Sequence, residues 1–265
     1  GFADARSLNN QIKTYINVTG LPQLPSAEAS AANICAGSDV SLSSDYTGEG
    51  IVRWFNQSSG GTALGTGSSF KTGALNKDTV LFAELTFNKS SGRLDQTGGE
   101  VVYNDSVGGL VFDAYYDFIL KSVTIYPNRT GLRFFTLRNA TGGVQTISYR
   151  VSRIGEQKVP LNFKVSPGAD QVLELTRGGE LSIVKATSSY PIAITDVLAI
   201  KYANNVADPE DYPYFFNWEI EYGYPCGRTP VFIDVEAKPQ AQFALPNSTP
   251  KANTALNFQN QSTGA

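Results

Sequence analysis

The amino-acid sequence predicts an all-β fold of the sandwich type, and three observations support this prediction. Short segments rich in β-branched and aromatic residues alternate between apolar and polar positions with period two, which is typical of strands with one buried face. Clusters of Gly, Asn and Ser separate these segments, and such residues favour turns. No amphipathic segment predicts a helix, and we interpret the short Ala-rich stretch Ser26–Ala32 as a linker between strands.

The expected strands follow one another at short intervals, as in β-sandwiches and jelly rolls. In chain order they are Gln11–Val18, Val40–Ser43, Val52–Phe55, Val80–Thr86, Ser122–Tyr126, Thr146–Val151, Val172–Leu175 and Val231–Val235. The expected turns are Ser58–Gly61, Gly108–Gly109, Asn139–Gly143 and Gly178–Gly179. One further strand carries its core-facing side chains at Tyr214, Phe216, Trp218, Ile220 and Tyr222.

The composition limits the classes of function. A chain of 265 residues has room for one large domain or about two to three ordinary ones. Hydrophobic residues make up 41% and charged residues 17%, which favours packed cores over disorder. The formal net charge of −3 makes nucleic acid and anionic membrane surfaces poor partners.

Histidine and methionine are both absent. Without His there is no Ser-His-Asp triad, no Cys-His pair and no imidazole metal ligand, so we predict that the chain is not an enzyme. The lack of Met indicates a processed product or a piece of a longer chain. No apolar run of about 18 residues predicts membrane insertion, and Gly1–Asp4 lacks a signal-peptide pattern.

An internal repeat indicates an array of modules. Tyr15–Gln23 matches Phe232–Gln240, and both segments are strand-like and end in Pro-Gln. A strand that closes one module and leads through Pro into the next fits such an array. Chance similarity between two strands is the alternative. On the first interpretation, residues 1–20 are the last strand of a preceding module.

Cys35 is followed by a strand and then by Trp54, an order typical of an immunoglobulin-like (Ig-like) sandwich. Here the chain resembles the Ig-like repeat of large surface proteins of Bacteroidetes. The segments that carry the resemblance are Asn33–Leu42, Val52–Phe55, Gly60–Phe70 and Asp78–Glu84, with Cys226–Val235 as the last strand.

This resemblance implies a disulfide between Cys35 and Cys226 and therefore an oxidising, extracellular setting. Two unrelated buried thiols are the alternative. The residues between the last two strands, about Arg93 to Tyr222, would then be an insertion.

The insertion resembles a jelly-roll module of the same secreted proteins. The matching segments are Val107–Ala114, Phe118–Tyr126, Pro160–Val165 and Phe215–Ile220. The tail resembles the opening of a PKD domain, an extracellular β-sandwich, although Lys251–Asn253 stand where a Cys sometimes occurs.

The expected domains are therefore a split Ig-like sandwich with an inserted jelly roll, placed within a tandem array of β modules. The boundaries are 1–20 for the preceding module, 21–93 and 223–238 for the split Ig-like domain, 94–222 for the jelly roll and 239–265 for the PKD-like start.

Aromatic residues beside acidic ones are the candidates for ligand binding. Tyr115, Tyr116 and Tyr212 occupy predicted loops next to carboxylates, and tyrosine rings can stack on the faces of sugars. Ordinary loop packing is the alternative. A surface polysaccharide or glycan is the expected kind of ligand.

The acidic loop with Asp208, Glu210 and Asp211 offers the oxygen ligands that Ca²⁺ takes. A solvated acidic turn is the alternative, since the spacing is not that of an EF-hand. No other cofactor is expected.

Thr79 and Ser106 are candidate O-glycosylation sites. Each follows an Asp and precedes a Val, which resembles the short Asp-Ser/Thr-aliphatic site of Bacteroidetes. A chance match of three residues is the alternative.

The resemblances imply a cell-surface adhesin or filament fragment, as in gliding bacteria that use type IX secretion. Its Ig-like part would act as a spacer among neighbouring β modules, and its jelly roll would bind ligand. The alternatives are a carbohydrate-binding accessory module of a secreted polysaccharide-degrading enzyme and a purely structural spacer.

Overall fold

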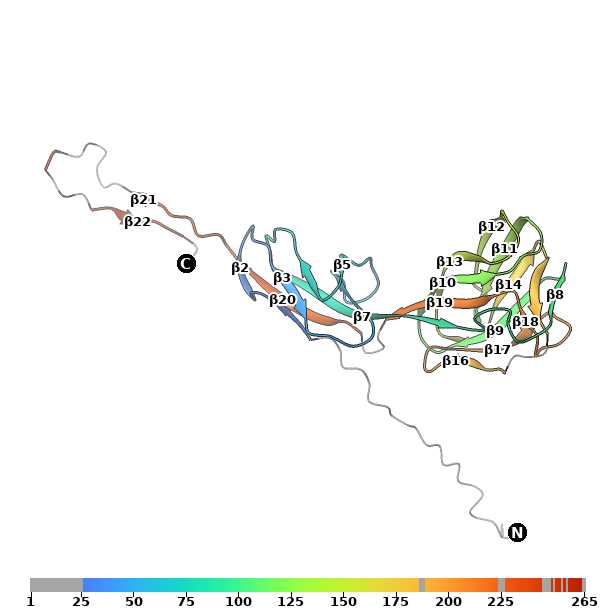
Figure 1. The fold of residues 1–265 in the computed structure, drawn as a ribbon. Helices are drawn as coiled ribbons and strands as arrows, with labels where there is room; N and C mark the ends of the chain where they lie inside the picture. The colour runs from blue at the N-terminus through green and yellow to red at the C-terminus, as the bar shows by residue number, and fades with distance from the viewer. Residues whose placement is uncertain are drawn as a thin grey trace, which may run out of the picture.

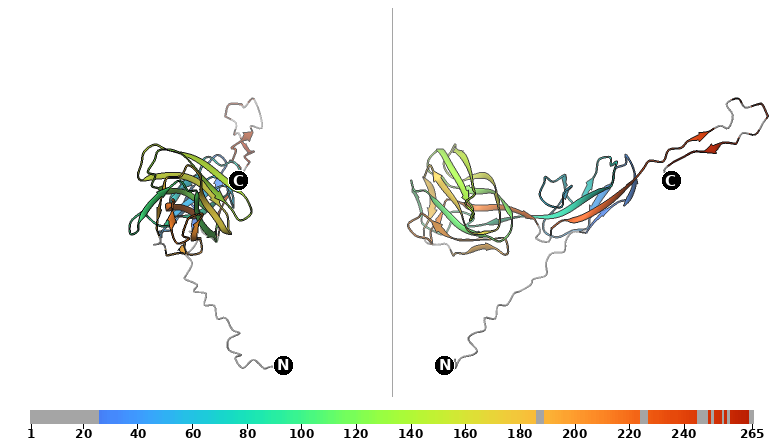
Figure 2. Two further views of the ribbon diagram at one scale, coloured as in Figure 1. Left: turned by 90° about the vertical axis from the view of Figure 1, so that its right-hand side faces the viewer. Right: turned by 180° about the vertical axis from the view of Figure 1, so that it is seen from behind.

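The computed structural model describes residues 26–185, 189–223, 227–244, 249, 251–253, 255 and 257–263. These residues form strands and no helix, which confirms the all-β prediction. They make two β-sandwiches that lie end to end, followed by a short hairpin (Figures 1 and 2). None of their segments is a helix long and apolar enough to cross a membrane.

The first sandwich combines the start of the described chain with one late strand. Its strands are β1 (Ala27–Ala29), β2 (Asn33–Cys35), β3 (Ser41–Ser44), β4 (Ile51–Phe55), β5 (Gly65–Thr66), β6 (Ser69–Lys71), β7 (Thr79–Ser91) and β20 (Thr229–Glu236). One sheet has the order β1-β3-β6, and the facing sheet contains β4, β7, β20 and β2. Trp54 and Leu42, both 0% exposed, lie in the core between the sheets.

Strand β20 belongs to this first core although it follows the whole second sandwich in sequence. Val231 and Ile233 point into the core, while Phe232 between them is 65% exposed. β20 pairs antiparallel with β7 and parallel with β2. The period-two alternation of this strand therefore places its apolar residues as the sequence predicts.

The second sandwich is built from the residues between β7 and β20. Its strands are β8 (Val101–Asn104), β9 (Gly108–Ala114), β10 (Phe118–Ile125), β11 (Gly131–Arg138), β12 (Val144–Val151), β13 (Gln157–Val165), β14 (Gly168–Arg177), β15 (Leu181–Val184), β16 (Ile192–Ile194), β17 (Leu198–Asn204), β18 (Tyr212–Pro213) and β19 (Phe216–Gly223). A sheet ordered β12-β11-β14-β9-β17-β16 packs on strands β13-β10-β19 around a large apolar cluster.

Strand β7 belongs to both sandwiches. Its first part pairs with β20 and β4, and its last part, Thr86–Ser91, pairs with Trp218–Gly223 of β19. One sheet therefore runs from β13 to β2 without interruption (Figure 1). The boundaries that the sequence predicts, at residues 93 and 223, lie at the ends of this β7–β19 pair.

Three local expectations need correction or fall outside the described residues. The predicted turn Gly108–Gly109 instead begins strand β9, where both glycines are buried beside β14 and β17 because these strands approach too closely for a Cβ. The predicted linker Ser26–Ala32 contains strand β1, in which Ala27 and Ala29 are half-buried against the first core and pair with β3. The prediction failed because a three-residue strand has only two inward-facing positions, which are too few to show an alternating pattern in the sequence. The expected strand Gln11–Val18, with the rest of the predicted module 1–20, lies outside the described residues.

The hairpin after the first sandwich consists of β21 (Phe243–Ala244) and β22 (Gln259–Asn260). Phe243 and Phe258 pack edge to face with ring centroids 5.4 Å apart. No described residue after Pro239 is buried. The predicted PKD-like start thus contributes a strand pair here, and its assignment to that domain stays a prediction.

Replacing Phe112 by Ala should lower the free energy of unfolding by about 3–5 kcal/mol. Phe112 is 0% exposed and packs edge to face on Trp218 at 5.2 Å, so the change leaves a cavity in the second core. Urea denaturation followed by Trp fluorescence measures the loss. The matched control, Phe232→Ala at a 65% exposed position, should change the stability little, and equal losses in both variants would contradict this core assignment.

Candidate functional site

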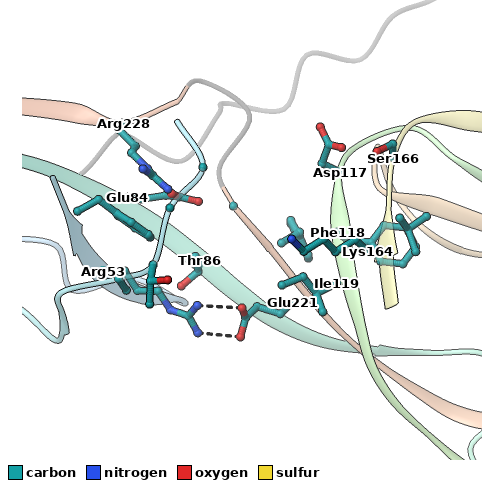
Figure 3. Close-up of a pocket in the computed structure, with 18 residues that line it drawn as sticks. Arg53, Glu84, Thr86, Asp117, Phe118, Ile119, Lys164, Ser166, Glu221 and Arg228 are labelled. Atoms are coloured by element: carbon teal, nitrogen blue, oxygen red, sulfur yellow. Dashed lines mark hydrogen bonds and ion pairs between the residues drawn. The ribbon is translucent and has the colours of Figure 1, made fainter. Parts of the chain in front are cut away.

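A cleft of about 610 Å³ lies where the two sandwiches meet. We call it the junction cleft, and Figure 3 shows its lining. One wall comes from the first sandwich and the opposite wall from the second. The residues that line it are Arg53, Phe55, Gly60, Gly61, Thr62, Ala63, Glu84, Thr86, Asp117, Phe118, Ile119, Lys164, Val165, Ser166, Glu221, Tyr222, Gly223 and Arg228. Clefts between domains are common places for ligand binding.

A bidentate ion pair, with two hydrogen bonds, joins the two sandwiches within the cleft. The guanidinium of Arg53 on β4 donates to both carboxylate oxygens of Glu221 on β19, at 2.8 and 2.7 Å (Figure 3). The Glu221 side chain is only 10% exposed, and the Lys121 ammonium lies 3.8 Å from it. A planar, bidentate pair of this kind fixes both position and orientation.

A second ion pair anchors the last strand to the cleft. Arg228, just before β20, donates from Nε to Glu84 at 2.6 Å and from a terminal nitrogen to the Gln57 carbonyl at 2.7 Å. Its guanidinium also lies 3.4 Å from the centroid of the Phe55 ring, a cation–π contact. At Gly223 a Cβ would collide with the Glu84 carboxylate, so a larger residue there would displace this side chain.

The opposite wall presents exposed polar groups. Asp117, Lys164 and Ser166 are exposed, and Figure 3 shows them across the cleft from Arg53 and Arg228. In the described part of the chain neither Asp117 nor Lys164 forms an ion pair. Burial raises the pKa of Tyr222, which completes the lining.

The two glutamates of the cleft are held in place by ion pairs. Glu84 and Glu221 are both engaged by guanidinium groups, and the sequence has no His to act as a general base. The charged groups of the first wall therefore hold the junction of the two sandwiches together, and we call this set of residues the joint. On the second wall, Asp117 and Lys164 are exposed to solvent.

The three tyrosines that the sequence predicts to bind ligand differ in their exposure to solvent. Tyr115 is 55% exposed and Tyr116 half-buried, in the loop that leads to Asp117 of the cleft. Tyr212 was wrongly predicted to be a ligand residue, because it is 0% exposed and its hydroxyl donates to the Phe215 carbonyl. Burial raises the pKa of Tyr212. Tyr212 lies in β18 and packs into the core of the second sandwich. The sequence did not indicate this, because the segment has the residue pattern of a loop.

The acidic loop does not form the predicted cation site. Asp211 is 1% exposed, and its carboxylate lies 2.6 Å from the Lys185 ammonium. Asp208 accepts a hydrogen bond from the backbone N–H of Glu210, whose side chain is exposed. No group of three acidic, Cys or His side chains suited to a metal occurs among the described residues. The loop closes on itself and on Lys185 instead of converging on a cation.

The candidate glycosylation residues differ in access. Ser106 is exposed in the loop between β8 and β9, and its backbone N–H is bound by Asn104. Thr79 is half-buried, and its hydroxyl donates to the Lys77 carbonyl at 2.8 Å. Both assignments stay predictions, and access favours Ser106.

The predicted disulfide cannot be followed to its second cysteine, because Cys226 lies outside the described residues. Cys35 is free and exposed at the end of β2, where its neighbour in the parallel pair is Glu236. The Cys35–Cys226 bridge therefore stays a prediction.

Comparison with known proteins supports the assignment of the first sandwich. Residues 22–99 match the family model described as an Ig-like domain associated with CHU_C. This part of the chain is therefore similar to Ig-like domains. The match ends after β7 and spans less than a third of the chain, whereas the structure adds β20 to the same core. No curated protein matches the chain significantly.

The residues of the joint were visible in the sequence but were given no role there. Arg53, Glu84 and Arg228 all lie inside the segments that resemble the Ig-like repeat. The partner of Arg53, Glu221, is 168 positions away. A pair this distant leaves no spacing signal, and only the fold brings its members together.

Replacing Glu221 by Ala should destabilise the protein by about 2–4 kcal/mol, because it leaves the Arg53 charge without its partner in a largely buried position. Thermal and urea unfolding measure the loss. The control Glu49→Ala removes an ion pair with Lys89 at a carboxylate that is 81% exposed and should have little effect. A Glu221→Ala variant as stable as the control would show that the pair is dispensable.

The thiol of Cys35 should react with iodoacetamide without prior reduction, because it is exposed and free in the structure. Peptide mass spectrometry identifies the labelled residue. Labelling that appears only after reduction would instead establish the Cys35–Cys226 bridge that the family resemblance implies.

Proposed function

We propose that the chain is part of a secreted bacterial cell-surface protein, an adhesin or filament, in which the first sandwich acts as a spacer. The second sandwich is then the part that meets a ligand. The Ig-like match at residues 22–99 supports the spacer role, since Ig-like sandwiches occur as repeated structural modules. The absence of His from the sequence supports a binding role over a catalytic one.

The observation that carries the proposal is the continuity of β7. This strand runs from Thr79 to Ser91 through both sandwiches, and the Arg53–Glu221 pair braces the same junction. A flexible linker would let an inserted module tumble freely, whereas a shared sheet holds it at a fixed angle. Such a connection suits a module that must be presented away from an array.

Export to the cell surface can be tested by immunolabelling. An antibody raised against the second sandwich should label intact, unpermeabilised cells of the source bacterium, and external protease should remove the signal. The control is an antibody to a cytoplasmic protein, which should label only permeabilised cells. Labelling that requires permeabilisation would contradict the surface assignment.

A carbohydrate-binding accessory module of a secreted enzyme is the second candidate. Exposed tyrosines on the second sandwich favour it, among them Tyr115 and Tyr202. A catalytic domain elsewhere in the parent chain would support this candidate, and further repeats would support the adhesin.

A further inference from the structure

A second hollow, separate from the junction cleft, lies on the outer side of the second sandwich. It has a volume of about 430 Å³ and is lined by Ser189, Tyr190, Lys201, Tyr202, Pro209 and Glu210. We call it the tyrosine groove. Its lining combines two aromatic rings with one ammonium and one carboxylate group.

A β-bulge in β17 creates the exposed side of the groove. Ile200 pairs with Phe112 and Tyr202 pairs with Val111, so Lys201 is an extra residue in the strand. Ile200 and Ala203 are buried, whereas the Lys201 side chain is 28% exposed and Tyr202 is 41% exposed. The bulge therefore turns two consecutive side chains to the solvent face. Bulges of this kind often aim side chains at binding sites.

Tyr190 is held rigidly on the buried layer beneath the groove. Its ring stacks on Tyr212 with centroids 6.2 Å apart and an angle of 14° between the planes. Its hydroxyl donates to the Asp211 carbonyl at 2.9 Å. Because Tyr212 is fully buried, Tyr190 rests on an immobile support. A preorganised ring loses little entropy when a ligand binds.

The charged groups around the groove give it a net negative character. The Lys201 ammonium lies 3.0 Å from Asp113 and 2.6 Å from Asp170. Glu210 adds an exposed carboxylate, and Asp208 lies beside it. The single ammonium is thus shared by two carboxylates, and this balance disfavours a polyanionic ligand.

We propose that the tyrosine groove binds a neutral oligosaccharide segment. The C–H face of a sugar ring would pack on Tyr202 and Tyr190, while Glu210 and Lys201 would accept and donate hydrogen bonds to its hydroxyl groups. The inference rests on the proposed function, in which the second sandwich is the ligand-binding part, and it names the ligand class and the residues.

Calorimetric titration of the whole chain with neutral hexasaccharides tests the proposal. The probes are cellohexaose, xylohexaose, mannohexaose and laminarihexaose, with hexagalacturonate as the anionic comparison. At least one neutral probe should bind more tightly than the anionic one. Tyr202→Ala should weaken that binding by about tenfold or more, and Glu210→Gln should weaken it as well.

The matched control is Tyr103→Ala, which removes a tyrosine of similar exposure, 39%, on β8 outside the groove. It should leave the affinity unchanged. Protection of Tyr202 from iodination by the bound sugar, read by peptide mass spectrometry, locates the site independently. Thermal unfolding of each variant verifies that it is folded.

The proposal would be overturned if none of the neutral probes bound. It would also be overturned if the binding survived Tyr202→Ala in the folded protein. Preferential binding of the anionic probe would also overturn it. The immunolabelling of intact cells does not depend on the tyrosines, so the surface assignment and the sugar site can fail separately.

Discussion

The structure depends on one strand, β7, that pairs with strands of both sandwiches. β7 supplies Leu81, Ala83 and Leu85 to the core of the first sandwich, and its last residues pair with β19 of the second. Because the backbone hydrogen bonds of a β-sheet continue from strand to strand, the two sandwiches are parts of one sheet. Their relative position is set by strand pairing and does not rely on a linker.

A shared strand alone would leave the junction free to twist, and the Arg53–Glu221 pair between β4 and β19 opposes this. Within the first sandwich, Arg228 just before β20 is held by Glu84 of β7. The two pairs differ in environment. Arg228 is 8% exposed at its side chain and packs on Phe55, whereas Arg53 is 24% exposed. Desolvated, well-oriented pairs of this kind contribute more to specific geometry than to net stability.

The sequence predicted well what depends on local alternation. The inward positions Val231 and Ile233 and the buried series from Tyr214 to Ile220 follow period two, and the structure buries them. It predicted poorly where the backbone departs from that period. Tyr214 has a positive φ of 64°, and at this turn Phe215 is buried together with both neighbours.

The candidate site shows the same division. Tyr115 and Asp117 could be nominated from sequence because acidic and aromatic residues stand side by side. The pairing of Arg53 with Glu221 and the bulge at Lys201 could not, since both depend on which strands become neighbours. In the sequence, Tyr202 looks like a residue of an ordinary strand. Only the strand register shows that Lys201, just before it, has no paired residue on β9.

The antiparallel pairing of β7 with β20 has a mechanical consequence. Thr229–Ile233 is hydrogen-bonded to Thr79–Ala83. The chain segments that enter and leave the second sandwich are therefore paired with each other inside the first sandwich. If the chain is pulled from both ends, the load passes between β2 and β20 and across these pairs. The second sandwich carries tension only after they break. If the chain is part of a filament under tension, as proposed, the second sandwich would lie beside the line of force and keep its shape.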